Sequence, residues 1–153
     1  MLQEGLIMNY EPGMLLAFRW DSNTYGVCKV LKITETRKDP IINIVTYANW
    51  FENIPEDLDF EQLKPLVVHM PMILSGLTMS DCTPIGKAEV KPEELEGYEN
   101  WNAAWKDRRA GFFERSISDA VDHVMEAMAQ VDNGGQDSVY RERLMRQWQN
   151  NRM

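Results

Sequence analysis

The chain has 153 residues, of which 44% are hydrophobic and 26% are charged, and its formal net charge is −8. This length and composition are typical of one globular domain with a core of its own. The acidic balance disfavours binding to nucleic-acid phosphates. No segment has the ~20 consecutive apolar residues of a membrane-spanning helix, and the first residues lack the basic region of a signal peptide. We therefore expect a cytoplasmic protein that binds neither nucleic acid nor membranes.

The first ninety residues contain five segments that are typical of β-strands. They are residues 14–20, 25–33, 41–47, 66–70 and 85–90. The first two flank a polar turn and follow Pro12-Gly13, which predicts a β-hairpin. The third is rich in β-branched residues, and its adjacent Ile41 and Ile42 indicate that both faces are partly covered. Together the five segments predict a curved antiparallel sheet or a small open barrel.

Helical patterns follow the last of these strands. Pro92 precedes acidic residues, as at the start of many helices, and we expect Gly97 to limit this helix to about one turn. Tyr98, Trp101 and Trp105 then recur at helical spacing and predict a second helical piece. The sequence therefore predicts an α+β fold in which C-terminal helices cover an N-terminal sheet.

The clearest helix spans residues 117–131, where apolar residues recur at steps of three and four behind the N-cap candidate Ser116. Gly134-Gly135 follows, and we interpret it as a hinge. Residues 138–153 carry four arginines and one glutamate, which predicts a basic helical arm after a single domain of residues 1–137. The arm either docks on its own acidic domain or engages a partner, including a second copy in a homodimer.

Carboxylates gather in two groups. The acidic loop, residues 52–61, contains Glu52, Glu56, Asp57, Asp59 and Glu61. The second acidic group consists of Glu89, Glu93, Glu94, Glu96 and Glu99, opposed only by Lys91. Each group suits a basic protein partner, while the alternative interpretation is a solvated surface that keeps the protein soluble.

Two aromatic residues lie directly before the carboxylates of the acidic loop. Most aromatic residues of this chain belong in a core between sheet and helices. Trp50 and Phe51 are instead candidate anchors of an interface, because aromatic residues inside a charged rim are common hot spots. The predicted partner-binding residues are Trp50, Phe51, Glu52, Glu56, Asp57, Asp59 and Glu61.

The sequence contains few candidate catalytic or metal-binding side chains. His69 and His123 have no neighbours at metal-ligand spacing, so we predict no metal site. Cys28 lies in a strand and is expected in the core, whereas Cys82 lies in a loop and is expected to be more accessible. A pair of Cys82 and His69 is the one nucleophilic arrangement that we consider. Phosphate-binding and dinucleotide-binding motifs are absent, and we predict no catalytic residue and no cofactor.

Three short motifs follow one another in the first part of the chain: a Pro-Gly start to an apolar strand, a Tyr-Gly return strand that continues to Lys-Val, and a late Ile-Gly strand. They occupy residues 11–18, 25–31 and 85–86. In this order they resemble the immunity protein 26 family, over residues 10–90. Members of that family protect a bacterium by neutralising a cognate toxin of a polymorphic toxin system. The turn at 21–23 without glycine and the helical extension after residue 91 depart from the family pattern and leave the partner's identity open.

The resemblance and the charge imply a non-enzymatic protein that binds and inhibits a basic toxin domain. The alternative is a small enzyme or ligand-binding domain with a pocket between sheet and helices, near His69, Tyr47 and Trp101. A third interpretation is a self-assembling protein that uses its C-terminal helix. An inhibitor presents carboxylates and aromatic residues on a flat or convex face, whereas an enzyme gathers polar groups in a concave pocket.

Overall fold

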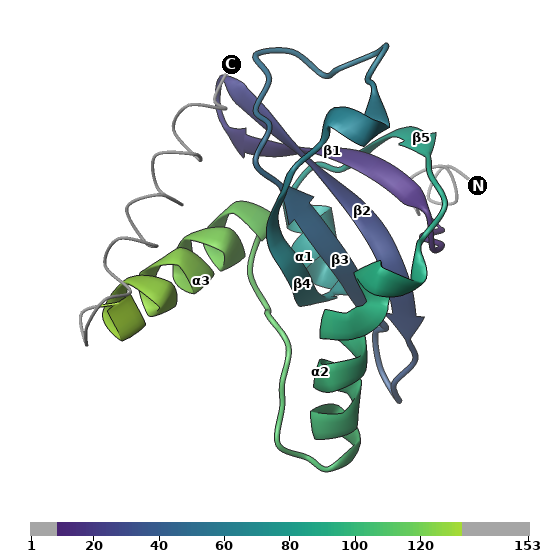
Figure 1. Ribbon diagram of the computed structural model, residues 1–153, viewed down its shortest axis with the longest axis vertical. Helices are drawn as coiled ribbons and strands as arrows, with labels where there is room; N and C mark the ends of the chain where they lie inside the picture. Colours follow the sequence, from purple (N-terminus) through teal and green to yellow (C-terminus); the bar gives the residue numbers. More distant parts are fainter. Residues whose placement is uncertain (1–8, 133–153) are drawn as a thin grey trace.

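One antiparallel sheet forms the centre of the structure, a computed structural model that describes residues 9–132 (Figure 1). The strands are β1 (Met14–Asp21), β2 (Thr24–Thr34), β3 (Ile41–Tyr47), β4 (Pro65–Ile73) and β5 (Thr83–Lys87). Their order across the sheet is β4-β3-β2-β1-β5. Register shifts interrupt all four ladders, and such bulges bend a sheet. The predicted α+β class, with a curved and open five-stranded antiparallel sheet, is confirmed, and each strand end lies within three residues of its predicted position.

One face of the sheet carries the larger of two cores, which we call the first core. Alternate strand residues such as Leu16 point to this face. Two helices cover it, α1 (Leu74–Met79) and α3 (Ile117–Asp132). They contribute Leu77 and Ile117, both of which are fully buried. The first core therefore joins the N-terminal hairpin to the last described helix.

The opposite face carries the second core, which includes Leu15 and Val27. It is covered by the connection between β3 and β4, which contains the 3₁₀ helix η2 (Phe60–Gln62), and by residues that lead into η3 (Pro92–Leu95) and α2 (Glu96–Lys106). In Figure 1, α2 lies in front of the sheet and α1 behind it. Because both faces are covered, all seven residues of β3 are buried, as the adjacent isoleucines predict.

The prediction that Gly97 ends a short helical piece is wrong. The helix does begin at Pro92, where the Lys91 amide donates to a Glu94 carboxylate oxygen at 2.8 Å, but η3 continues directly into α2. Gly97 lies in the first turn of α2. A Cβ atom at this position would lie 2.9 Å from the Cβ of His69 on β4. The glycine therefore allows α2 to lie close to the sheet, and it does not end a helix.

The predicted helix at 117–131 is confirmed as α3, which ends one residue later. Its N-cap is also confirmed, because the Asp119 amide donates to Ser116 Oγ at 3.3 Å. The sequence does not predict α1, whose six residues are too few to display a helical period. The Gly134-Gly135 break, the basic arm at 138–153 and the last residues of the predicted domain lie outside the described residues.

We predict that Gly97→Ala lowers the free energy of unfolding by about 1 kcal/mol. The new methyl group must push α2 away from His69 on β4, and overpacking of this kind costs ~1–3 kcal/mol. Alanine gains at most ~1 kcal/mol of helix propensity over glycine, and less in a first turn. Chemical denaturation measures the difference. Gly111→Ala is the matched control, since a Cβ atom added there would meet no other atom within 4 Å. A stabilised Gly97→Ala would show that α2 does not depend on this contact.

Candidate functional site

The acidic loop lies over the second core and carries its charges on the outside. All of its carboxylates are exposed: Glu52, Glu56, Asp57, Asp59 and Glu61. Phe51, Leu58 and Phe60 are half-buried and pack against the second core from the same segment. The apolar residues thus hold the segment on the sheet, and the carboxylates face solvent as a consequence.

Backbone and ring contacts fix the acidic loop in place. Phe51 exchanges two backbone hydrogen bonds with Tyr25 of β2, at 2.7 and 2.9 Å. Asp59 caps η2 by accepting a hydrogen bond from the Glu61 amide at 3.1 Å. The ring of Phe60 lies over Gly86, where a Cβ atom would be 2.7 Å from the ring. A partner would therefore meet a preformed surface, and binding would cost little ordering entropy.

Trp50 cannot anchor an interface, which corrects the sequence prediction for this residue. Its side chain is only 1% exposed and belongs to the first core. Its ring centroid lies 4.1 Å from that of Trp20 and 6.4 Å from that of Phe18. Phe51, the next residue, packs on the second core instead, because successive side chains of extended backbone point to opposite sides. The apolar side chain that the loop does expose is Ile54, which no sequence pattern distinguishes.

The second acidic group lies next to the acidic loop in space. Between them is a hollow of about 700 Å³, lined by Glu61 on one side and by Glu89 and Glu94 on the other, with Tyr47 of β3 between them. Glu89 is exposed, as are Glu93, Glu96 and Glu99. The hollow is also lined by Lys29, Lys87 and Lys91, as many cations as carboxylates, while its surroundings are acidic. We call the acidic loop, the hollow and the second acidic group together the acidic face.

A buried ion pair holds the second acidic group on the sheet. Lys29 of β2 is 5% exposed, and its Nζ lies 2.8 Å from both carboxylate oxygens of Glu94. The same ammonium donates to the Glu89 carbonyl at 3.2 Å. Burial, together with the nearby Glu94, raises the pKa of Tyr47 in the same hollow. Glu94 thus neutralises Lys29 and ties η3 to the floor of the hollow.

The candidate nucleophiles and bases do not come together. His69 lies on β4 and Cys82 directly precedes β5, and these strands form opposite edges of the sheet. Cys82 is half-buried against the first core and is more accessible than Cys28, as predicted, but burial raises its pKa to about 12. Cys28 is fully buried, as expected. A Cys82–His69 pair is therefore not formed.

His69 takes part in a network beneath α2. Its Nε2 lies 2.8 Å from Asn43 Oδ1, while the Asn43 amide group donates to Thr34 Oγ1 and to the Lys32 carbonyl. The amide oxygen must therefore accept, and His69 Nε2 carries the proton. Burial lowers the pKa of His69 to about 4, so the ring is neutral near pH ~7.

The alternative pocket near His69, Tyr47 and Trp101 is formed only in part. The rings of His69 and Trp101 are in contact, with centroids 5.6 Å apart. Tyr47 lines the hollow of the acidic face, whose walls include neither of the other two. A separate cavity lies at the far end of α2, where Trp105 lines it instead of Trp101.

Within residues 9–132, no group of three or more His, Cys, Asp or Glu side chains could hold a metal ion. None of the described helices is long and apolar enough to cross a bilayer. No protein-family model, no curated protein and no solved structure matches this chain.

We predict that Glu94→Gln lowers the free energy of unfolding by about 2–4 kcal/mol, because it leaves the buried Lys29 ammonium without its counter-charge. Glu93→Gln is the matched control, since Glu93 is the exposed neighbour, and it should change stability by less than about 0.5 kcal/mol. Thermal or chemical denaturation distinguishes the two. Equal stability of both variants would show that the ion pair does not hold η3.

We also predict that His69 makes folding stability fall as the pH drops from about 6.5 to about 4. In this window the unfolded chain binds a proton that the folded protein does not, which costs up to ~1.4 kcal/mol per pH unit. Above this pH window the unfolded chain no longer binds the proton, so His69 no longer lowers the free energy of unfolding. The stability advantage of the wild type over His69→Gln should therefore shrink on acidification. His123→Gln removes an exposed imidazole and is the matched control. A constant difference across the window contradicts the prediction.

Proposed function

We propose that this protein is a non-enzymatic inhibitor of the immunity type that acts in the cytoplasm and binds a basic protein partner, such as a toxin domain, through the acidic face. The resemblance of residues 10–90 to the immunity protein 26 family suggests the class. The observation that carries the proposal is the convergence of two acidic groups, separated by about thirty residues of sequence, around one hollow.

Charge supports a basic partner. Residues 52–64 contain five carboxylates and one lysine, and residues 87–99 contain five carboxylates and two lysines, so these two segments hold most of the net charge of −8. A concentrated field of one sign raises the rate of encounter with a partner of opposite sign. The same field repels nucleic acid. This suits an inhibitor of a basic nuclease, because the inhibitor must bind the nuclease and not the nucleic acid.

The rigidity of the acidic face supports a binding function more than a solubilising one. A surface that only keeps a protein soluble does not need a fixed geometry. Here the loop is held by the Phe51–Tyr25 backbone pair and the Phe60–Gly86 contact, and η3 is held by Lys29. The exposed Ile54 supplies an apolar contact within the charged loop. Mixed polar and apolar character of this kind is typical of transient protein interfaces.

The proposal predicts that a toxin domain is encoded beside the gene for this chain, and that domain is the partner for the test. We predict that the triple variant Glu56→Lys, Asp57→Lys and Asp59→Lys associates with it about tenfold or more slowly at low salt, and with a weaker salt dependence. Stopped-flow or surface-binding kinetics at two ionic strengths measure this rate. Thermal stability should fall only by the ~0.5–2 kcal/mol that loss of the Asp59 cap of η2 costs, because all three side chains are exposed.

The control variant Glu35→Lys, Asp107→Lys and Glu126→Lys makes the same change in net charge at exposed positions away from the acidic face. It should keep most of the association rate. His69→Gln and Cys82→Ala should bind normally if the function is non-enzymatic. Loss of protection from the toxin in a folded Cys82→Ala variant would support the enzyme alternative, and an unchanged rate for the acidic-loop variant would remove this loop from the interface.

A further inference from the structure

A groove of about 510 Å³ lies between the start of α2 and the sheet, beside the hollow of the acidic face. Strands β3 and β4 form one side of this groove, and η3 and α2 form the other. Pro65 and Glu94 line both the groove and the hollow, so the two are neighbours. The volume is within the range of sites for small ligands and is ample for one long side chain of a partner.

The sheet side of the groove is apolar. Val45 of β3 is buried there, and Pro65 is exposed. Val68 of β4 is 64% exposed, more than any other large apolar side chain in residues 9–132. A Cβ atom at Gly97 would lie 3.7 Å from Val68 Cγ2, so the absence of a side chain at Gly97 keeps the groove open on the helical side. The groove therefore offers an apolar surface that a partner can reach.

The helical side of the groove is acidic. Glu93 and Glu96 are exposed, and because they are three residues apart their Cβ atoms lie within ~6 Å on one side of the helix. Glu94 is paired with Lys29, whereas among residues 9–132 no ion pair involves Glu93 or Glu96. Asn100, one turn further along α2, adds an amide group to the same side. Two carboxylates are therefore available to a cation in the groove.

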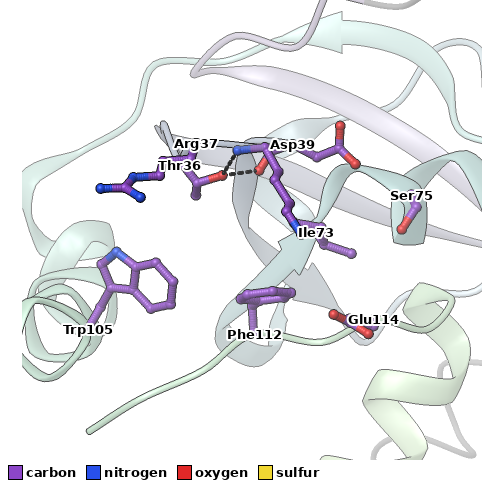
Figure 2. A pocket seen from close by; sticks show the side chains of 9 residues that line it. Thr36, Arg37, Asp39, Ile73, Ser75, Trp105, Phe112 and Glu114 are labelled. Atoms are coloured by element: carbon purple, nitrogen blue, oxygen red, sulfur yellow. Dashed lines mark hydrogen bonds between the residues drawn. The ribbon is translucent and has the colours of Figure 1, made fainter. Parts of the chain in front are cut away.

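The two cavities described above contain cations of their own. Three lysines line the hollow of the acidic face. The cavity at the far end of α2 is lined by Arg37 and Lys38 as well as by Asp39 and Glu114 (Figure 2). By contrast, the described residues that line the groove include no lysine, arginine or histidine. Of these three sites, the groove is therefore the most complementary to a positively charged ligand.

We propose that the groove receives an arginine side chain of the basic partner, an inference that rests on the proposed function and names one anchor of that interface. The aliphatic part of the arginine packs on Val45, Pro65 and Val68, as long basic side chains do on apolar surfaces. Its guanidinium group faces Glu93 and Glu96. Arginine suits this site better than lysine, because a planar group with five donors can bridge two carboxylates, whereas an ammonium group is a point charge.

The probe is N-acetylarginine N-methylamide, titrated into the full chain at constant ionic strength and followed by two-dimensional amide NMR. It should shift the amide signals of Val68 and Gly97 saturably, with a dissociation constant of about 1–10 mM. The citrulline analogue has the same shape without the charge, and the guanidinium ion has the charge without the aliphatic part. Each should bind at least about threefold more weakly. The lysine analogue should also bind more weakly than the arginine probe.

The decisive variant is Glu96→Lys, which replaces an attracting charge with a repelling one and should weaken binding of the arginine probe at least about threefold. Glu99→Lys is the matched control. It makes the same change at an exposed position in the first turn of α2, but Glu99 does not line the groove, so the affinity should stay within about twofold of the wild type. Val68→Ser should weaken binding of the arginine probe but not of the guanidinium ion, because it removes apolar surface only.

Three results would each overturn the inference: equal affinity for the arginine and citrulline probes, no saturable shift of the Val68 and Gly97 signals up to about 50 mM, or equal losses in folded Glu96→Lys and Glu99→Lys variants. None of these measurements involves the toxin domain. They are therefore separate from the test of the proposed function, which is the association rate of the acidic-loop variant.

Discussion

The sheet has two apolar faces, and the need to cover both determines most of this structure. Helices α1 and α3 cover the first face, as expected of an α+β protein. The second face is covered largely by connecting segments, which have little regular structure of their own. Such segments remain in place only if some side chains pack inward and the others face solvent. The arrangement of the acidic face follows from this constraint.

The contacts that cover the second core also position the charges. Phe51, Leu58 and Phe60 hold the acidic loop, and Lys29 holds Glu94. A buried ammonium requires a counter-charge, so the ion pair fixes η3 beside the loop although it adds little net stability of its own. The result is an acidic surface around a hollow, the surface through which we propose that a basic protein binds. His69 and Cys82, the groups best suited to catalysis, lie at opposite edges of the sheet.

The acidic face and the cavity beside Trp105 differ in their chemistry. The acidic face is extended and mostly of one sign, so it favours fast association with a basic protein. The cavity beside Trp105 is smaller and is lined by aromatic rings and by charges of both signs. Both are built from connections anchored to the sheet.

The sequence by itself determined the parts of this protein that depend on local patterns. The hairpin, the β-branched third strand and the helix behind Ser116 each follow from alternation, turn residues or helical period. Local patterns could not decide which side of the sheet a residue faces after a turn, so they predict Trp50 at an interface although it lies in the first core. They also could not assign Gly97 to helix packing, since that role depends on His69, twenty-eight residues earlier. Folding of the sheet also brings distant connections together. Glu61 and Glu89 thereby line one hollow, and Arg37, Trp105 and Glu114 line another. These sites are products of tertiary structure, because long-range packing alone sets the distances between segments that share no sequence pattern.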